Sequence, residues 1–274
     1  MKFLVTGHKG FIGSHFVKRL DNYEGYDLVD DRDLKTIKFF PECDVVVHLA
    51  ATNGTDLFYT HPTDVSFNNT LPTFNLVNWY RNKDVKFVFA STCEIFNHTD
   101  QIPTTESVDI SFKDILNPRW SYSLPKALGE NLVANCGLRY LIIRYFNIYG
   151  PNQKLHFINE FVERALRGDY WIIGNETRSF CYIDDAIEMT HRLVNTVDNQ
   201  IVNVGKSVET PIETVAKIIL NILEIDPDKL EIVPSRIGSA PRRLPDTKQV
   251  HSLTGFNNYT SLETGLRLTI ESLL

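Results

Sequence analysis

A glycine-rich loop near the start of the chain most constrains the fold. Residues 3–6 form a short apolar run, Gly7, Gly10 and Gly13 follow at intervals of three, and apolar residues at helical spacing come next. A strand, a glycine loop and a helix in this order are typical of a unit that binds a dinucleotide. Gly7 would make the tight turn, Gly10 would bring the backbone close to a pyrophosphate, and Gly13 would let the helix pack closely. A glycine-rich turn without a ligand is the alternative.

Strands and helices alternate along the first 150 residues. Apolar runs typical of buried strands cover residues 26–29, 43–51, 85–90 and 138–145, and helical patterns cover residues 65–81 and 122–133. This alternation predicts an α/β fold with a doubly wound parallel sheet of the Rossmann type. We expect a dinucleotide-binding domain over residues 1–150. A smaller C-terminal α/β lobe over residues 151–274 would bind the substrate, with some segments returning to the first domain.

The second lobe carries two capping sequences and a basic segment. Thr210-Pro211-Ile212-Glu213 predicts a helix with proline at its first position that runs to about Leu223, and Thr260-Ser261-Leu262-Glu263 predicts a final amphipathic helix. Residues 234–248 form a basic, loop-like segment that includes Arg236, Arg242 and Arg243. Arginines beside a dinucleotide domain indicate a second, phosphorylated ligand, and a surface charge patch is the alternative.

Composition limits the kinds of partner. The chain has 274 residues, 43% of them hydrophobic, and a net charge of -6, so a sizeable core is expected and nucleic acid is not. No apolar run approaches the length of a membrane span, and the N-terminal run is too short for a signal peptide. The four cysteines, Cys43, Cys93, Cys136 and Cys181, lack the spacing of a metal site. They are expected to be reduced thiols of a cytoplasmic protein.

Tyr122 and Lys126 are the leading candidates for catalysis. Their spacing places both side chains on one face of a helix, which Pro125 requires to begin at about Ser121 or Tyr122. Lowering the pKa of a tyrosine from about 10 to about 7 requires roughly 4 kcal/mol of preferential phenolate stabilisation. A nearby ammonium together with a cationic nicotinamide ring could provide it. A surface helical pair is the alternative.

Other candidates lie where predicted strands end, because ligands of open α/β sheets bind beyond the carboxyl ends of the strands. Thr92 and Glu94 follow one strand and are placed where chemistry is expected. The small residues Ala50 and Ala51 end another strand and would let a cofactor lie close. His48, within that strand, is expected to be a satisfied core histidine.

The second strand is followed by acidic residues. Asp30 or Asp31 would accept hydrogen bonds from the adenosine ribose, which favours NAD over NADP. Lys9 and Arg32 could instead meet a 2′-phosphate. Residues 97–119 are expected to form an irregular loop that covers a substrate.

Several separate stretches together resemble the NAD-dependent nucleotide-sugar epimerase/dehydratase family of extended short-chain dehydrogenases/reductases. The resemblance covers nearly the whole chain. It rests on Tyr122 with Lys126 and on residues 6–13, 44–51, 90–94, 144–151, 178–185 and 242–246. It implies a tightly held nicotinamide cofactor, a nucleoside-diphosphate sugar and a transient 4-keto sugar. It also implies a homodimer through the helices over residues 65–80 and 122–134.

The resemblance also implies roles for particular residues. Tyr122 would remove the proton of the sugar 4-hydroxyl, Lys126 would lower the pKa of Tyr122 and hold the nicotinamide ribose, and Thr92 would hydrogen-bond the 4-oxygen. The implied substrate contacts are Thr92, Asn147, Arg178 and Arg243, with Arg242 as a neighbour. Pro72 replaces the glycine usual after the asparagine at position 69. The predicted cofactor-binding set is Gly7, Gly10, Phe11, Ile12, Gly13, Asp30, Asp31, Leu49, Ala50, Ala51, Asn69, Tyr122 and Lys126.

The triplet Thr92-Cys93-Glu94 bears on the reaction that follows oxidation. In related 4,6-dehydratases the glutamate takes the C5 proton, decarboxylases resemble the version with serine and glutamate, and 4-epimerases need no such base. Cys93 would be a poor general acid, with a reference pKa of about 8.5. We therefore expect a 4-epimerase, with a 4,6-dehydratase or uronate decarboxylase that uses Glu94 as the alternative. An NADPH-dependent keto-sugar epimerase/reductase and an idle NAD-binding member also remain open.

Overall fold

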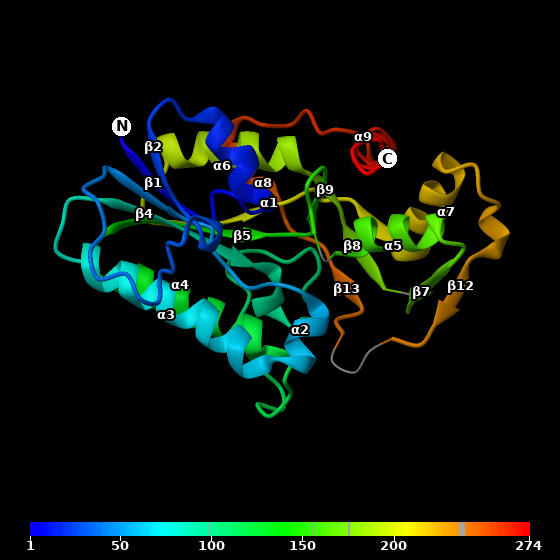
Figure 1. Cartoon of the computed structure of the whole chain (residues 1–274), viewed down its shortest axis with the longest axis horizontal. Helices are drawn as coiled ribbons and strands as arrows, with labels where there is room; N and C mark the ends of the chain where they lie inside the picture. The colour runs from blue at the N-terminus through cyan, green and yellow to red at the C-terminus, as the bar shows by residue number, and fades with distance from the viewer. Residues whose placement is uncertain (98, 155, 175, 236–238) are drawn as a thin grey trace.

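The computed structural model describes residues 1–97, 99–154, 156–174, 176–235 and 239–274, and Figure 1 shows the arrangement of its elements. The larger part is built on a six-stranded sheet with the strand order β10-β5-β4-β3-β1-β2. All neighbouring strands in it are parallel, which confirms the predicted doubly wound sheet. The strands are β1 (Phe3–Thr6), β2 (Tyr23–Tyr26), β3 (Val45–His48), β4 (Lys86–Thr92), β5 (Arg139–Tyr145) and β10 (Gln200–Val204).

Helices cover both faces of the sheet (Figure 1). One face carries α3 (Pro62–Tyr80) and α4 (Trp120–Asn135), and the other carries α1 (Phe11–Phe16), α6 (Ile183–Thr196) and α8 (Lys248–Thr254). Along β4, Phe87 and Phe89 point into the core beneath α3 and α4, whereas Val88 points into the core beneath α1 and α6. Burial on both faces explains why the central strands β1 and β3 are apolar along nearly their whole length rather than alternating.

The second lobe is formed mostly by residues after Gly150. Its helices are α5 (Phe157–Leu166), α7 (Ile212–Ile222) and α9 (Leu262–Glu271). Its strands are β6 (Ile148–Tyr149), β7 (Trp171–Ile173), β8 (Thr177–Ser179), β9 (Cys181–Tyr182), β11 (Glu209–Pro211), β12 (Glu231–Val233) and β13 (Arg242–Arg243). In the part of the chain that the structure describes, no helix is both long enough and apolar enough to cross a membrane.

The second strand and the helix after Thr210 differ from the prediction. The second strand spans Tyr23–Tyr26 rather than residues 26–29, and residues Leu28–Asp30 form a 3₁₀ turn, η2. The side chain of Asp27 ends the strand by accepting the amide N–H of Val29. In the second lobe, Thr210 lies in β11 opposite Arg178, and α7 starts only at Ile212 without a side-chain cap. Pairing with β8 holds Thr210 in the strand and Pro211 takes the N-cap position instead, so the capping pattern at Thr210 was misleading.

The helix that carries the candidate catalytic pair starts slightly earlier than predicted. It begins at Trp120, so Pro125 lies beyond its first turn. A proline has no N–H to donate to the carbonyl four residues before it, here that of Ser121. The hydroxyl of Ser66 on α3 donates to this carbonyl at 3.2 Å. This contact satisfies the group that Pro125 leaves unpaired.

The predicted role of His48 is confirmed. The imidazole is fully buried, with Nδ1 2.7 Å from the Thr6 hydroxyl and Nε2 3.0 Å from the Thr73 hydroxyl. Burial lowers the pKa of His48 to about 3, and the positive charge of Lys126 acts in the same direction. His48 is therefore a neutral core residue that joins β1, β3 and α3.

Candidate active site

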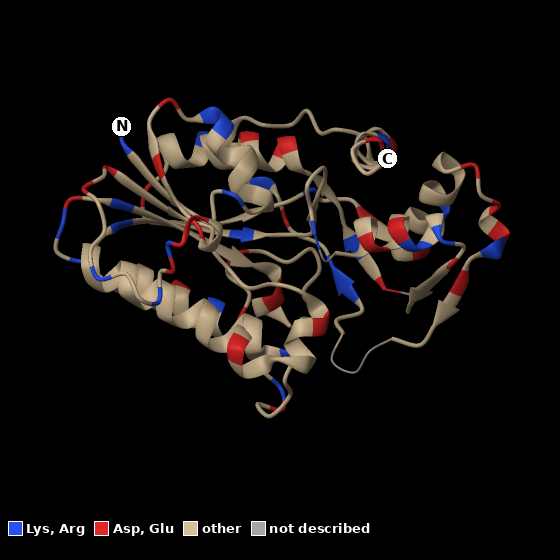
Figure 2. Cartoon of the chain, in the orientation of Figure 1, with Lys and Arg blue, Asp and Glu red and all other residues tan. Residues whose placement is uncertain are grey.

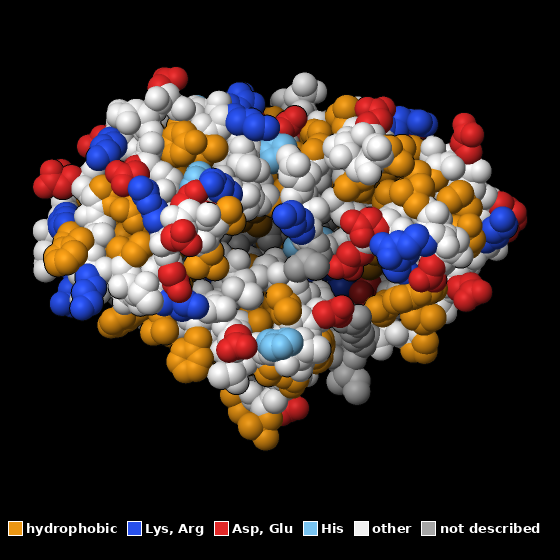
Figure 3. Space-filling view, in the orientation of Figure 1, with side chains coloured by type: hydrophobic (Ala, Val, Ile, Leu, Met, Phe, Trp, Pro, Cys, Tyr) orange, Lys and Arg blue, Asp and Glu red, His pale blue; other side chains and the backbone are white. Residues whose placement is uncertain are grey.

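A cavity of about 1000 Å³ lies between the carboxyl ends of the sheet strands and the second lobe. Figure 3 shows a hollow near the middle of the face of the molecule that it displays. The glycine loop, Thr92, Tyr122 and Lys126 line the cavity, as do Arg178 and Arg243 from the other side. The fold thus brings together in one cavity the three sets of residues that the sequence predicted to be functional.

The glycine loop has the backbone geometry that close approach of a ligand requires. Gly7 has a φ of +70°, a backbone conformation that residues other than glycine rarely adopt. A Cβ atom on Gly13 would lie 2.0 Å from the carbonyl oxygen of Gly7, so α1 packs against the loop only with glycine there. The start of α1 also leaves backbone N–H groups without helical partners, which suits a pyrophosphate. These residues fit a dinucleotide cofactor.

Beyond the end of β2, the cavity wall contains Asp27 and neither Asp30 nor Asp31. The Asp27 carboxylate accepts the backbone N–H of Lys9 at 3.1 Å. Asp30 instead forms an ion pair with the Lys9 ammonium and lies 3.3 Å from His8 Nε2. The sequence prediction placed the end of β2 three residues too late, which is why it selected Asp30 and Asp31 for the ribose contact.

Asn69 supports the cavity wall without lining it. Its side-chain oxygen accepts the Thr52 N–H at 3.1 Å, and its amide group donates to the Thr52 carbonyl at 2.9 Å. The cavity wall itself contains Pro72 and the run Leu49-Ala50-Ala51-Thr52. In this structure Asn69 therefore positions the loop after β3, and the cofactor contact that the resemblance implied stays a prediction.

Tyr122 and Lys126 lie on the cavity side of α4, as their spacing predicted. The Tyr122 ring stacks on Phe58 with 5.2 Å between ring centroids, and the Lys126 ammonium donates to the Ala90 carbonyl at 2.7 Å. Burial lowers the pKa of Lys126 to about 7, although Glu130 opposes the shift. Burial also raises the pKa of Tyr122, and the charge of Glu94 adds to this rise.

The predicted lowering of the Tyr122 pKa is therefore not found in the protein alone. A hydrogen bond with Thr92 is the one contribution that lowers this pKa, and burial outweighs it. The Lys126 ammonium lies 5.9 Å from the centroid of the Tyr122 ring. Stabilisation of the phenolate therefore has to come from charge that arrives with a bound ligand.

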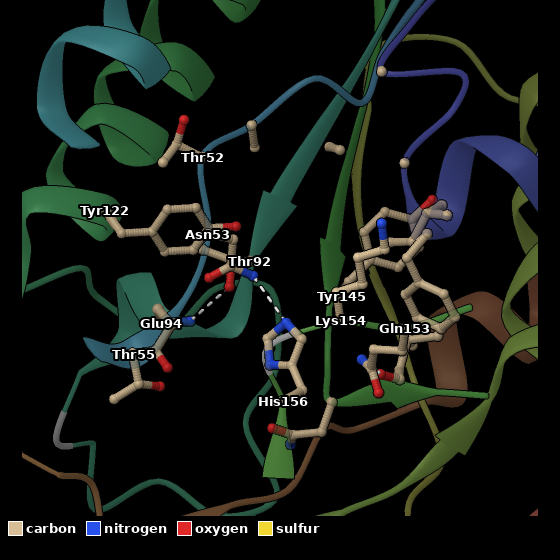
Figure 4. A pocket seen from close by; sticks show the side chains of 18 of the residues that line it. Thr52, Asn53, Thr55, Thr92, Glu94, Tyr122, Tyr145, Gln153, Lys154 and His156 are labelled. Carbon is tan, nitrogen blue, oxygen red and sulfur yellow. Dashed lines mark hydrogen bonds between the residues drawn. The ribbon is translucent and has the colours of Figure 1, made fainter. Parts of the chain in front are cut away.

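Glu94 lies between two arginines just beyond β4. The Thr92 hydroxyl accepts the Glu94 N–H at 3.2 Å and so caps the 3₁₀ turn η3 (Cys93–Phe96), as Figure 4 shows. The carboxylate of Glu94 accepts from Arg119 Nη2 at 3.1 Å and from Arg243 Nη2 at 2.7 Å. Burial alone would raise the pKa of Glu94, but Arg243 and Arg119 outweigh it and hold the pKa at about 2. Glu94 is thus a fixed carboxylate.

The remaining predicted substrate contacts divide into two groups. Arg178 and Asn147 line the cavity, and the buried amide nitrogen of Asn147 has no hydrogen-bond partner among the described residues. Burial lowers the pKa of Arg178 to about 10, and Arg243 acts in the same direction. Arg242 on β13 forms an ion pair with Glu209 at 2.6 Å and does not line the cavity, and Figure 2 shows β13 coloured for its two arginines. Arg236 lies outside the described residues.

The sequence analysis missed two residues of the site. Arg119 precedes Tyr122 by one helical turn, a spacing that could have placed it near the same end of α4. His156 stands at the start of α5 and faces the cavity from the second lobe (Figure 4). Nothing in the local pattern marked His156, because its approach to Glu94 depends on how the lobe packs on the sheet.

Comparison with known proteins identifies the family. The NAD dependent epimerase/dehydratase family matches residues 3–205 of the sequence. The chain belongs to this family. The resemblance on which the sequence analysis relied is confirmed, and so is NAD as the cofactor, since the family is NAD-dependent. The glycine loop and the wall around Asp27 are the parts of this chain that fit it.

Members with several activities are similar to this chain over nearly its full length. A UDP-N-acetyl-alpha-D-glucosaminuronate decarboxylase of Bacillus cytotoxicus is 30% identical over 98% of this chain and 96% of the relative. A putative UDP-glucose 4-epimerase of Methanocaldococcus jannaschii is 29% identical over 97% of this chain and 96% of the relative. The solved structure of MoeE5 in complex with UDP-glucuronic acid and NAD has a TM-score of 0.87 at 25% identity, covering 100% of this chain and 99% of the other.

Proposed function

We propose that this chain oxidises C4 of a UDP-linked uronic acid and releases the carboxyl group as carbon dioxide. The observation that carries the proposal is the pair of guanidinium groups, from Arg119 and Arg243, around Glu94 at the end of β4. Arg243 comes from the lobe that would hold the diphosphate, whereas Arg119 is the N-cap residue of the helix that carries Tyr122. A cation at this second position suits an acidic sugar better than a neutral one.

The residues of this chain divide the work of oxidation among them. The Tyr122 phenolate accepts the proton of the 4-hydroxyl, and the Thr92 hydroxyl hydrogen-bonds the same oxygen. NAD, when bound, would supply the acceptor for the hydride of C4 and the source of the hydride that returns to C4 after the carboxyl group has left, so no added cofactor is consumed. Lys126 supports the site through its bond to the Ala90 carbonyl and holds the cofactor ribose.

Decarboxylation after this oxidation needs no further catalytic base from the protein. The ketone at C4 makes the carboxylate at C5 a β-keto acid, so the C5–C6 bond breaks with its electron pair passing into the C4 carbonyl. Thr92 stabilises the oxygen on which the negative charge develops. A proton from solvent then adds at C5, and Tyr122 returns its proton to the 4-oxygen as the hydride returns to C4. No base is needed at C5, so a Glu94 that remains ionised between two arginines is compatible with this step.

A 4,6-dehydratase is less well supported. Its chemistry needs a base at C5 and an acid for the leaving 6-hydroxyl. Glu94, with a pKa of about 2, is too weak a base for the first role. Burial raises the pKa of the Cys93 thiol, which weakens it further as an acid for the second.

A 4-epimerase is the second candidate. It needs only Tyr122, Thr92 and Lys126, all of which line the cavity. Because a 4-epimerase needs no base at C5 and no further acid, it was the reaction expected from the sequence. Arg119 beside the reacting end is the observation that moves our proposal toward an acidic substrate.

The test is to incubate the protein as purified, without added cofactor, with UDP-glucuronic acid, UDP-N-acetylglucosaminuronic acid and UDP-glucose. We expect a product lighter by one carbon dioxide from an acidic sugar, measured by mass spectrometry. A product of unchanged mass but altered retention would establish an epimerase instead. Turnover only with added NADPH would establish a reductase, and no turnover with intact NAD binding would favour an idle member.

We also propose that the chain forms a homodimer through α3 and α4. These neighbouring helices leave Phe67, Leu71 and Phe74 of α3 and Leu128 of α4 at 38% to 56% exposure, an apolar patch on one face. Replacing Phe67 and Phe74 together by glutamate should convert the dimer to a monomer in light scattering. Leu268→Glu on α9 is the control and should leave the dimer intact. A wild-type monomer at micromolar concentration would contradict the proposal.

A further inference from the structure

His156 is a cavity residue to which the oxidation and decarboxylation steps assign no role. It occupies the N-cap position of α5 with extended backbone (φ -137°, ψ 156°), and its side chain makes no capping bond. The imidazole therefore faces the cavity rather than the helix. Figure 4 shows it next to Asn53 and on the same side as Glu94.

The hydrogen bond of His156 defines what the ring can donate. Nε2 lies 3.3 Å from the side-chain nitrogen of Asn53. An amide nitrogen only donates, so Nε2 accepts, and the hydrogen of the neutral ring lies on Nδ1. In Figure 4 the second ring nitrogen lies toward Glu94 and the cavity. Nδ1 is therefore the atom placed to contact a ligand.

The surroundings keep this ring neutral until a further negative charge arrives. Burial lowers the pKa of His156, and the negative charge of Glu94 opposes this shift without cancelling it. The charge of Glu94 is already shared with Arg119 and Arg243. Other charged residues on the cavity wall include Asp56 of α2 (Thr55–Thr60), Glu160 of α5 and Lys154.

We propose that His156 is a specificity residue that hydrogen-bonds the carboxylate of the bound sugar acid and takes up one proton as it does so. The proposal rests on the proposed function in that it assigns a partner to the acidic group of the same substrate. An opposite charge at hydrogen-bond distance favours the imidazolium form. Nδ1–H donates to the carboxylate, the added proton lies on Nε2, and the Asn53 amide turns over so that its oxygen accepts from Nε2. The proton comes from solvent and is returned when the carboxylate leaves as neutral carbon dioxide. A neutral sugar presents a hydroxymethyl group at this point and provides no such charge.

Calorimetry in two buffers of different ionisation enthalpy measures this proton directly. The protein is used as purified with its cofactor and carries Tyr122→Phe so that ligands are not converted. At pH 7.5 we expect UDP-glucuronic acid to take up about one proton more than UDP-glucose does. In the additional variant His156→Gln this difference should disappear. Its affinity for UDP-glucuronic acid should fall about 10- to 100-fold, as for a lost charge-assisted hydrogen bond, while its affinity for UDP-glucose stays the same.

His191→Gln, on the outside of α6, is the matched control and should behave like the parent protein. An equal proton uptake for both ligands, or a difference that survives His156→Gln, would overturn the role of His156. Equal loss of affinity for both ligands would reduce His156 to a structural residue. These results are separate from the proposed function. If wild-type protein binds UDP-glucuronic acid with the extra proton but releases no carbon dioxide, the decarboxylase proposal fails and the role of His156 stands.

Discussion

Replacing Tyr122 by phenylalanine is expected to lower kcat by about 10²- to 10⁴-fold, the range for loss of a positioned general base. The phenol is buried at the end of the cavity with Thr92 as its polar neighbour, so no other described side chain replaces it there. The ring still stacks on Phe58, and the glycine loop is untouched, so NAD should remain bound. Turnover of the UDP-sugar and the cofactor released on denaturation are the two measurements.

Tyr140→Phe is the matched control for this variant. Tyr140 lies at the opposite end of the sheet, near the start of β5, and should tolerate loss of its hydroxyl without change in kcat. If Tyr122→Phe keeps wild-type turnover, Tyr122 is not the base, and the C4 oxidation proposed here loses its starting point. If it loses both turnover and NAD, its role is structural.

Much of the fold was predictable because it depends on local patterns. The strand, glycine loop and helix at residues 3–16, the apolar strands and the spacing of Tyr122 and Lys126 each report on a few consecutive residues. Parallel strands place their carboxyl ends at one edge of the sheet, so Thr92 and the loop after β3 were also expected near one another. The structure confirms that these residues line one cavity.

The site was less predictable wherever the outcome depends on pairing between distant segments. Arg243 was expected to bind phosphate, but it contacts Glu94, which lies 149 residues earlier. Asp27 lines the cavity in place of Asp30 and Asp31 because the end of β2 is set by a turn that the Asp27 side chain caps, not by apolar periodicity. Asn69 has the expected position but acts through Thr52. Sequence spacing alone contains none of these contacts.

Replacing Glu94 by glutamine is expected to lower the free energy of unfolding by about 3–5 kcal/mol, the cost of breaking a buried ion pair from one side. Arg119 and Arg243 are only 5% and 8% exposed and would be left without a counter-charge. The Nε atoms of both arginines already lack a hydrogen-bond partner among the described residues. Loss of the Glu94 carboxylate would therefore add to the unsatisfied buried donors. Urea unfolding at pH 7 measures the loss. Glu263→Gln, which removes an exposed pair with Arg267 on α9, is the control and should cost less than about 1 kcal/mol.

The pH dependence of unfolding gives a second measure of the same cluster. The folded pKa of Glu94, about 2, lies below its ordinary value of 4.5, so its contribution to stability is complete above about pH 4.5 and is lost as the pH falls toward 2. At about 1.36 kcal/mol for each pH unit, this contribution is about 3 kcal/mol. Wild-type protein should therefore lose more stability than Glu94→Gln between pH 5 and pH 2. Parallel pH curves for the two proteins would mean that the arginines do not hold Glu94 ionised. Glu94 could then act as a base at C5, and a 4,6-dehydratase would again be a candidate.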